Sequence, residues 1–159
     1  MKNVHQWFDE YAESHQNSTN RTIHWIAIPL IMFSTLGLFW AASDGLRSAL
    51  GLTLPEYINL ATLLLIVGMI WYLVMSVRLF VAMVPVVVLM IYGLWAIRSS
   101  NVAPLWAICA AIWIGAWIAQ FIGHKIEGKK PSFFKDIQFL LVGPFWLMGK
   151  LFKKVGLSY

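Results

Sequence analysis

The chain has 159 residues, of which 60% are apolar and only 12% charged, and it contains nine tryptophans. This composition excludes an ordinary soluble domain of this length and places the protein in a lipid bilayer. The net charge of +5 therefore indicates lysines beside anionic lipid headgroups, with no nucleic-acid partner, and the single cysteine excludes a disulfide framework within one copy.

Four apolar runs are each about the 20 residues that a helix needs to cross a hydrocarbon core. They lie at residues 23–42, 60–77, 79–97 and 102–122. Each should be helical, because a helix satisfies its own backbone hydrogen bonds in lipid. Only Arg78 separates the second run from the third, and we expect a turn there because an uninterrupted helix would be implausibly long. The predicted fold is an all-α integral membrane domain over residues 1–159, with about four transmembrane helices.

A fifth apolar stretch, residues 137–147, is too short to cross the bilayer as a helix. Gly143 and Pro144 lie within it and are expected to interrupt it. We interpret residues 137–152 as a re-entrant or interfacial segment. The lysines that follow are mixed with apolar residues, which is typical of a surface-lying anchor.

The basic residues predict the orientation. Four spans would place both termini and the turn at Arg78 on one side, together with ten of the twelve lysines and arginines. Only Arg47 and Arg98 would fall on the opposite side. The positive-inside rule then predicts cytoplasmic termini, and the expected location is a bacterial inner membrane.

Three of the four histidines should meet at one membrane boundary. His15 precedes the first run, His24 lies at its start, and His124 lies at the end of the fourth run. Each has polar residues at helical spacing: Tyr11 with His15, Asn20 with His24, and Gln120 and Glu127 with His124. Ligating groups at membrane depth are costly, so this convergence marks a candidate functional site.

Two interpretations of these histidines remain open from the residues alone. Each could anchor a helix at the headgroup level through one hydrogen bond. His5 lies outside these pairings and is expected to be solvated or interfacial. Alternatively, three imidazoles, or two with a carboxylate, could bind iron, zinc, copper or nickel and leave coordination positions open. The sequence lacks both the tight histidine clusters of membrane di-iron enzymes and the helical zinc-protease motif.

Two polar motifs and a glycine-proline segment occur in a fixed order. They are Tyr11-x3-His15-x4-Asn20-x3-His24 with Ile28-Pro29-Leu30, then Gln120-Phe121-Ile122-Gly123-His124-x2-Glu127-x3-Pro131, and finally Leu140-Leu141-Val142-Gly143-Pro144. Over nearly the whole chain, this set resembles the small multi-pass membrane family of the fungal 2-hydroxy fatty acid dioxygenase, the Mpo1-like family. The middle spans match only as apolar helices.

The resemblance implies an Fe(II)-dependent dioxygenase that shortens a 2-hydroxy fatty acid by one carbon through α-oxidation and releases CO2. The implied partners are the 2-hydroxy fatty acid, O2 and membrane lipids. The substrate supplies all four electrons, so no further organic cofactor is required. The implied metal ligands are His15, His24 and His124, with Glu127 as a fourth ligand or a base beside the metal.

The resemblance also implies supporting residues. Tyr11, Asn20 and Gln120 would hydrogen-bond the ligands or the substrate headgroup, which fixes ring tautomer and orientation. Arg21 and Lys125 would attract the fatty carboxylate.

Three other functions compete with the enzyme. The main alternative is a non-catalytic lipid-binding or scaffolding protein whose histidines and Glu127 form only a polar plug, without stoichiometric metal. A two-histidine haem site is a second alternative. A transporter or proton relay is disfavoured, because charged residues between positions 28 and 115 occur only near loops and leave no ionisable path across the midplane.

Overall fold

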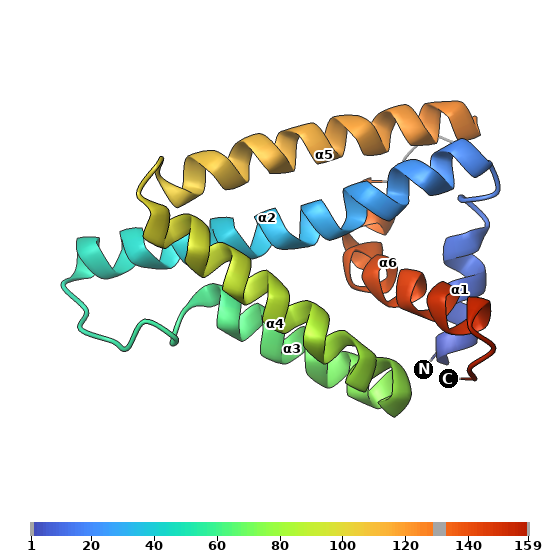
Figure 1. The fold of residues 1–159 in the computed structure, drawn as a ribbon, viewed down its shortest axis with the longest axis horizontal. Helices are drawn as coiled ribbons and strands as arrows, with labels where there is room; N and C mark the ends of the chain where they lie inside the picture. Colours follow the sequence, from blue (N-terminus) through green and yellow to red (C-terminus); the bar gives the residue numbers. More distant parts are fainter. Residues whose placement is uncertain (1, 129–132, 159) are drawn as a thin grey trace.

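The computed structural model describes residues 2–128 and 133–158, with the side chains of residues 133–138 excepted. Within this part of the chain all regular structure is helical. The helices are α1 (Val4–Ala12), α2 (Ser18–Leu50), α3 (Leu60–Met75), α4 (Val77–Ser100), α5 (Leu105–Glu127) and α6 (Phe133–Lys154) (Figure 1). The predicted all-α fold is confirmed.

Three of these helices, α2, α4 and α5, are long and apolar enough to cross a membrane. Helix α3 is also apolar but has 16 residues, fewer than the roughly 20 that a straight crossing needs. Large apolar side chains cover the outer surface of the helices, among them Leu63, Ile70 and Leu89, which are each more than half exposed. Such a surface requires lipid around it, so this is an integral membrane protein.

Helices α2 and α5 lie side by side and form the most extensive helix pair, while α3 and α4 form a second pair (Figure 1). Small residues allow the close approach of α2 and α5. A Cβ atom on Gly37 would lie 2.2 Å from Sγ of Cys109, which is itself fully buried. Any larger side chain at position 37 would force the two helices apart. Helices α1 and α6 and both termini gather at one end of this bundle (Figure 1).

The break between α3 and α4 lies at Ser76, two residues before the predicted turn at Arg78. Ser76 adopts an extended conformation (φ −163°, ψ 116°) and its Oγ accepts a hydrogen bond from the backbone N–H of Leu79. It therefore caps the first turn of α4. Arg78 lies inside that turn and donates a hydrogen bond to the carbonyl of Ser158 near the C-terminus (3.1 Å).

Residues 137–152 lie within one helix, α6, which continues through Gly143 and Pro144. This differs from the interruption that these two residues led us to expect. Tertiary contacts hold the helix, because Phe145 and Trp146 are buried and the Tyr72 hydroxyl donates to the carbonyl of Leu141 (2.9 Å). The re-entrant or interfacial placement of the segment stays a prediction.

Ion pairs neutralise the two basic residues at the opposite end of the bundle. Asp44 pairs with Arg47 (3.5 Å) and with Arg98, and Arg98 also pairs with Glu56 (3.1 Å). The other lysines and arginines that the structure describes lie towards the end that carries the termini.

The alternating course of α2, α3, α4 and α5 predicts that the α2–α3 loop and the N-terminus lie on opposite sides of the membrane. With Cys109→Ala as background, a cysteine at Thr53 should react with an impermeant maleimide in intact cells. A cysteine at His5 should react only after permeabilisation. Labelling of both sites from outside would contradict a membrane crossing by α2.

Candidate metal centre

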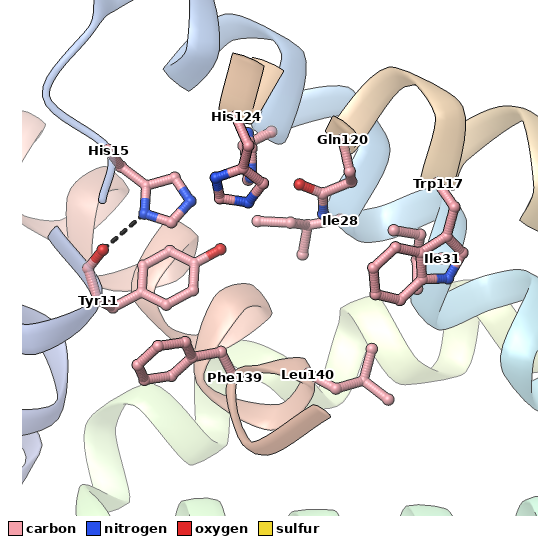
Figure 2. Close-up of a pocket in the computed structure, with 10 residues that line it drawn as sticks. Tyr11, His15, Ile28, Ile31, Trp117, Gln120, His124, Phe139 and Leu140 are labelled. Carbon is pink, nitrogen blue, oxygen red and sulfur yellow. Dashed lines mark hydrogen bonds between the residues drawn. The ribbon is translucent and has the colours of Figure 1, made fainter. Parts of the chain in front are cut away.

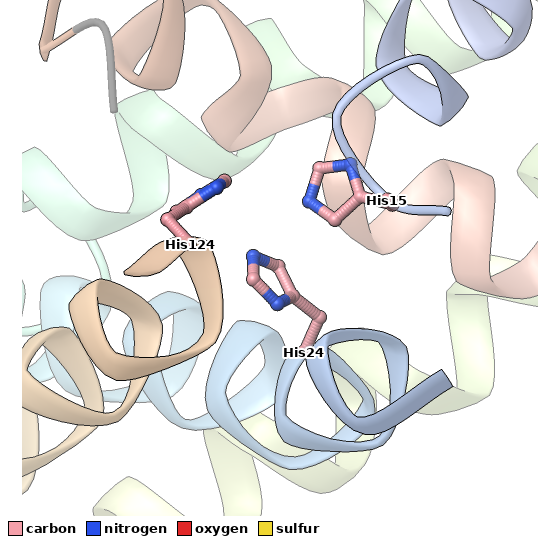
Figure 3. A group of neighbouring side chains, drawn as sticks. All are labelled: His15, His24 and His124. Atoms are coloured by element: carbon pink, nitrogen blue, oxygen red, sulfur yellow. The ribbon is translucent and has the colours of Figure 1, made fainter. Parts of the chain in front are cut away.

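Three separate segments bring His15, His24 and His124 together. His15 lies in the turn between α1 and α2, His24 in the second turn of α2, and His124 in the last turn of α5. All three are buried, and one nitrogen from each lies within 4.8 Å of the others (Figure 3). The predicted convergence of these side chains is therefore present as a compact group of nitrogen donors.

Backbone carbonyls define which nitrogen carries the proton in two of the rings. Nδ1 of His15 lies 2.6 Å from the carbonyl oxygen of Tyr11 (Figure 2), and Nδ1 of His24 lies 2.9 Å from that of Asn20. A carbonyl can only accept a hydrogen bond, so each ring donates from Nδ1 and carries its lone pair on Nε2. This is how metal-binding histidines are commonly oriented.

Aromatic rings hold His15 in place. The Tyr11 ring stacks on the His15 imidazole, with centroids 4.1 Å apart and planes 10° from parallel. The Trp146 ring from α6 lies 5.7 Å from the His15 ring. Helices α1 and α6 thereby fix a side chain that otherwise belongs to a short turn.

Glu127 joins the end of α5 to the segment that carries His15. One carboxylate oxygen accepts from the backbone N–H of Gln16 (2.7 Å), and the other accepts from the N–H of Asn17 (2.9 Å) and the Asn20 amide (2.9 Å). The Asn20 amide also donates to the carbonyl of Ser14 (3.1 Å). Both Glu127 oxygens are thus engaged, and the compact donor group consists of the three histidines.

A glycine allows α2 and α5 to meet at the site. A Cβ atom on Gly123 would lie 2.4 Å from Oδ1 of Asn20 and 3.4 Å from Cε1 of His24. Real Cβ atoms essentially never approach an oxygen at the shorter distance. The absence of a side chain at position 123 therefore brings His124, its neighbour on α5, close to His24.

The histidines line a small cavity of about 40 Å³ (Figure 2). Its polar wall comprises Tyr11, His15, His24, Gln120 and His124, and its apolar wall comprises Ile28, Ile31, Trp117, Phe139 and Leu140. The Gln120 side chain lines this cavity together with His24. Its buried Oε1 has no hydrogen-bond partner within the described part of the chain, so a bound molecule could provide one.

Five of the predicted site residues therefore line one cavity, and Asn20 and Glu127 lie directly beside it. Arg21 and Lys125 do not line it. Arg21 donates to the carbonyl of Gln16 (2.8 Å), and Lys125 is exposed. Pro131, the last residue of the second motif, lies outside the described residues.

The sequence analysis missed Trp146 and Lys150 on α6. Lys150 Nζ lies 4.9 Å above the Trp146 ring, which in turn faces His15. Burial, together with the neighbouring cations Lys153 and Arg21, holds the pKa of Lys150 below its usual value. Trp146 and Lys150 are four residues apart, which places them on the same face of a helix, and this spacing could have indicated that they contact each other.

The fold and this site together define a helical membrane protein with a buried three-histidine centre suited to a metal ion. The chain belongs to the Mpo1-like family, because the family model for 2-hydroxy-palmitic acid dioxygenase Mpo1-like proteins matches residues 1–155. The family resemblance predicted from the motifs is confirmed. No curated protein and no solved structure matches the chain.

The close contact at Gly123 yields a stability prediction. Gly123→Ala should lower the free energy of unfolding by about 1–3 kcal/mol, because the added methyl group overpacks the α2–α5 contact. Thermal unfolding in detergent measures the change. Gly115→Ala is the matched control, since a Cβ atom on this glycine of the same helix would meet nothing within 4 Å. Equal effects of the two substitutions would contradict the packing argument.

Proposed function

We propose that this protein is an Fe(II)-dependent dioxygenase of 2-hydroxy fatty acids. With 2-hydroxypalmitic acid, the reaction consumes one O2 and gives pentadecanoic acid, CO2 and water, so atoms and electrons balance without another reductant. The observation that carries the proposal is the buried histidine cluster, in which His15 and His24 both present Nε2 lone pairs. Membership of a family named for such a dioxygenase supports it.

The three histidines fit a divalent iron ion. Neutral imidazole nitrogen is a suitable ligand for iron, and three protein ligands leave positions open. One nitrogen of each histidine lies within 4.8 Å of the others, so side-chain rotation would let the three rings hold one ion. Bound iron(II) would supply the redox chemistry that makes O2 reactive.

Other residues of the chain would bind and orient the substrate. The buried Gln120 Oε1 can accept a hydrogen bond from the substrate 2-hydroxyl group. Ile28, Ile31 and Phe139 form an apolar wall that excludes water from the reacting carbon. Arg21 and Lys150, which influence each other electrostatically, would attract the carboxylate from the aqueous side.

We assign Glu127 a positioning role, because both of its oxygens hold the segment that carries His15. Asn20 has the same role, since its amide connects that segment to Glu127. The stacked Tyr11 ring keeps the His15 imidazole facing the cavity.

We also propose that the termini and the histidine centre face the cytoplasm of a bacterial cell whose inner membrane holds the protein. The concentration of lysines and arginines towards this end supports the orientation. The carboxylate end of a fatty acid resides at such a boundary, while its alkyl chain remains in the hydrocarbon.

Metal analysis tests the proposal. Protein purified without oxygen and supplied with iron(II) should hold about one iron per chain, and His15→Ala, His24→Ala and His124→Ala should each lose most of it, because two ligands remain. His5→Ala is the matched control, since His5 is exposed and lies outside the cluster. Iron-loaded wild type should convert 2-hydroxypalmitic acid into pentadecanoic acid with equimolar oxygen uptake.

Two outcomes would contradict this assignment. If wild type holds no iron even when iron(II) is supplied, the histidines form the polar plug of a non-catalytic membrane protein. If iron binds but pentadecanoic acid is not formed, the metal centre stands and the assigned substrate is wrong.

A further inference from the structure

Two apolar hollows lie beyond the histidine cavity in the bundle. The nearer one has a volume of about 230 Å³ and shares Leu140 with the histidine cavity. The farther one has a volume of about 390 Å³ and reaches Trp40 and Tyr57 near the opposite end of the bundle. The two hollows share Leu36, Leu65, Met69 and Val87.

The three spaces follow one another along α2. His24, Ile28 and Ile31 face the histidine cavity, Thr35 and Leu36 face the nearer hollow, and Leu36 and Trp40 face the farther one. Trp40 lies 16 residues after His24 on this helix. At about 1.5 Å per residue, the series extends for about 24 Å.

The lining of both hollows is almost entirely apolar and contains no charged side chain among the described residues. The hydroxyl of Tyr72, the one phenol that lines the nearer hollow, donates a hydrogen bond to the carbonyl of Leu141. This bond also connects α3 to α6 across the hollow and keeps the two helices at a fixed spacing. The space therefore suits an alkyl chain and offers little to a polar ligand.

From this order along α2, and from the Leu140 side chain that borders both spaces, we propose that the nearer hollow, extended by the farther one, holds the alkyl tail of the 2-hydroxy acid whose headgroup lies at the histidines. The proposal rests on the function proposed above and adds where chain length is recognised. The three backbone bonds of one residue in an extended polypeptide span at most about 3.6 Å, or about 1.2 Å per bond, and we use this value for an extended alkyl chain. The tail of 2-hydroxypalmitic acid, about fourteen carbons beyond C2, would thus extend for about 17 Å, within the length of the series.

The shape of the hollow, and not its hydrophobicity, should determine which tail lengths the protein prefers. A tail that moves from lipid into this hollow exchanges one hydrocarbon environment for another, so burial itself gives little selectivity. A residue that narrows the hollow should therefore exclude long tails and leave short ones unaffected.

Gly68 on α3 is the position that tests this. It is buried and lines the nearer hollow, and a Cβ atom there would lie 3.3 Å from Cδ2 of Leu141. That neighbour is the end of a flexible side chain, which can give way. A leucine at position 68 should then fold normally and occupy space that we assign to the tail.

The experiment compares turnover of 2-hydroxypalmitic and 2-hydroxyoctanoic acid by iron-loaded protein. Gly68→Leu should lower kcat/KM for the long acid about tenfold or more, while kcat/KM for the short acid stays within about twofold. Gly115→Leu, the same substitution where the added side chain faces open space, should leave the ratio unchanged. The tail site would be overturned if Gly68→Leu turned over both acids and kept the wild-type ratio of kcat/KM for the long acid to kcat/KM for the short acid.

A binding measurement separates this inference from the proposed reaction. Palmitic acid with a photoreactive diazirine at its terminal carbon should crosslink wild type at Leu65, Met69 or Val87, and this crosslinking should fall several-fold in Gly68→Leu. Crosslinks confined to outward-facing residues such as Leu89 would overturn the tail site. If wild type turns over neither acid but still shows these crosslinks, only the proposed reaction is refuted.

Discussion

The site depends on the contact between α2 and α5 at Asn20, Gly123 and Glu127. Gly123 allows the helices to approach until the buried Asn20 side chain touches the backbone of α5. Glu127, one turn further along α5, then receives the Asn20 amide and two backbone N–H groups of the preceding segment. One helix contact therefore sets the positions of His24 and His124 directly and that of His15 through the segment.

Most polar groups of this contact satisfy one another, which lowers the cost of burying them, and the exception among the described residues is Oδ1 of Asn20. Tyr11 lies in the last turn of α1, where a carbonyl has no N–H partner within the helix, and the His15 ring donates to it. The backbone N–H groups of Gln16 and Asn17 find their acceptor in the Glu127 carboxylate. The end of one helix and the start of the next thus orient a histidine without an additional buried charge.

The sequence predicted the helical membrane fold and the meeting of the three histidines, because apolar runs and alternating crossings determine which helix ends share a boundary. It did not predict the break at Ser76, where a capping hydroxyl outweighed the nearby Arg78. Nor did it predict the continuity of α6, since packing of Phe145 and Trp146 offsets the local effect of Gly143 and Pro144. The contact of Trp146 with His15 joins residues far apart in the chain, and a single sequence contains no signal for such a contact.

Helix α2 connects the two physical environments that a lipid-modifying enzyme needs. Its first turns carry Asn20 and His24 among hydrogen-bonding groups, and one side of its middle lines the two largely apolar hollows. A ligand with a polar head and a long tail matches both ends of this gradient, whereas a small polar molecule would match only the first. Leu140 of α6 lines both the histidine cavity and the nearer hollow, so α6 forms part of the boundary between them. The same helix places Trp146 against His15, so movement of α6 would change the shape of the nearer hollow and the position of His15 together.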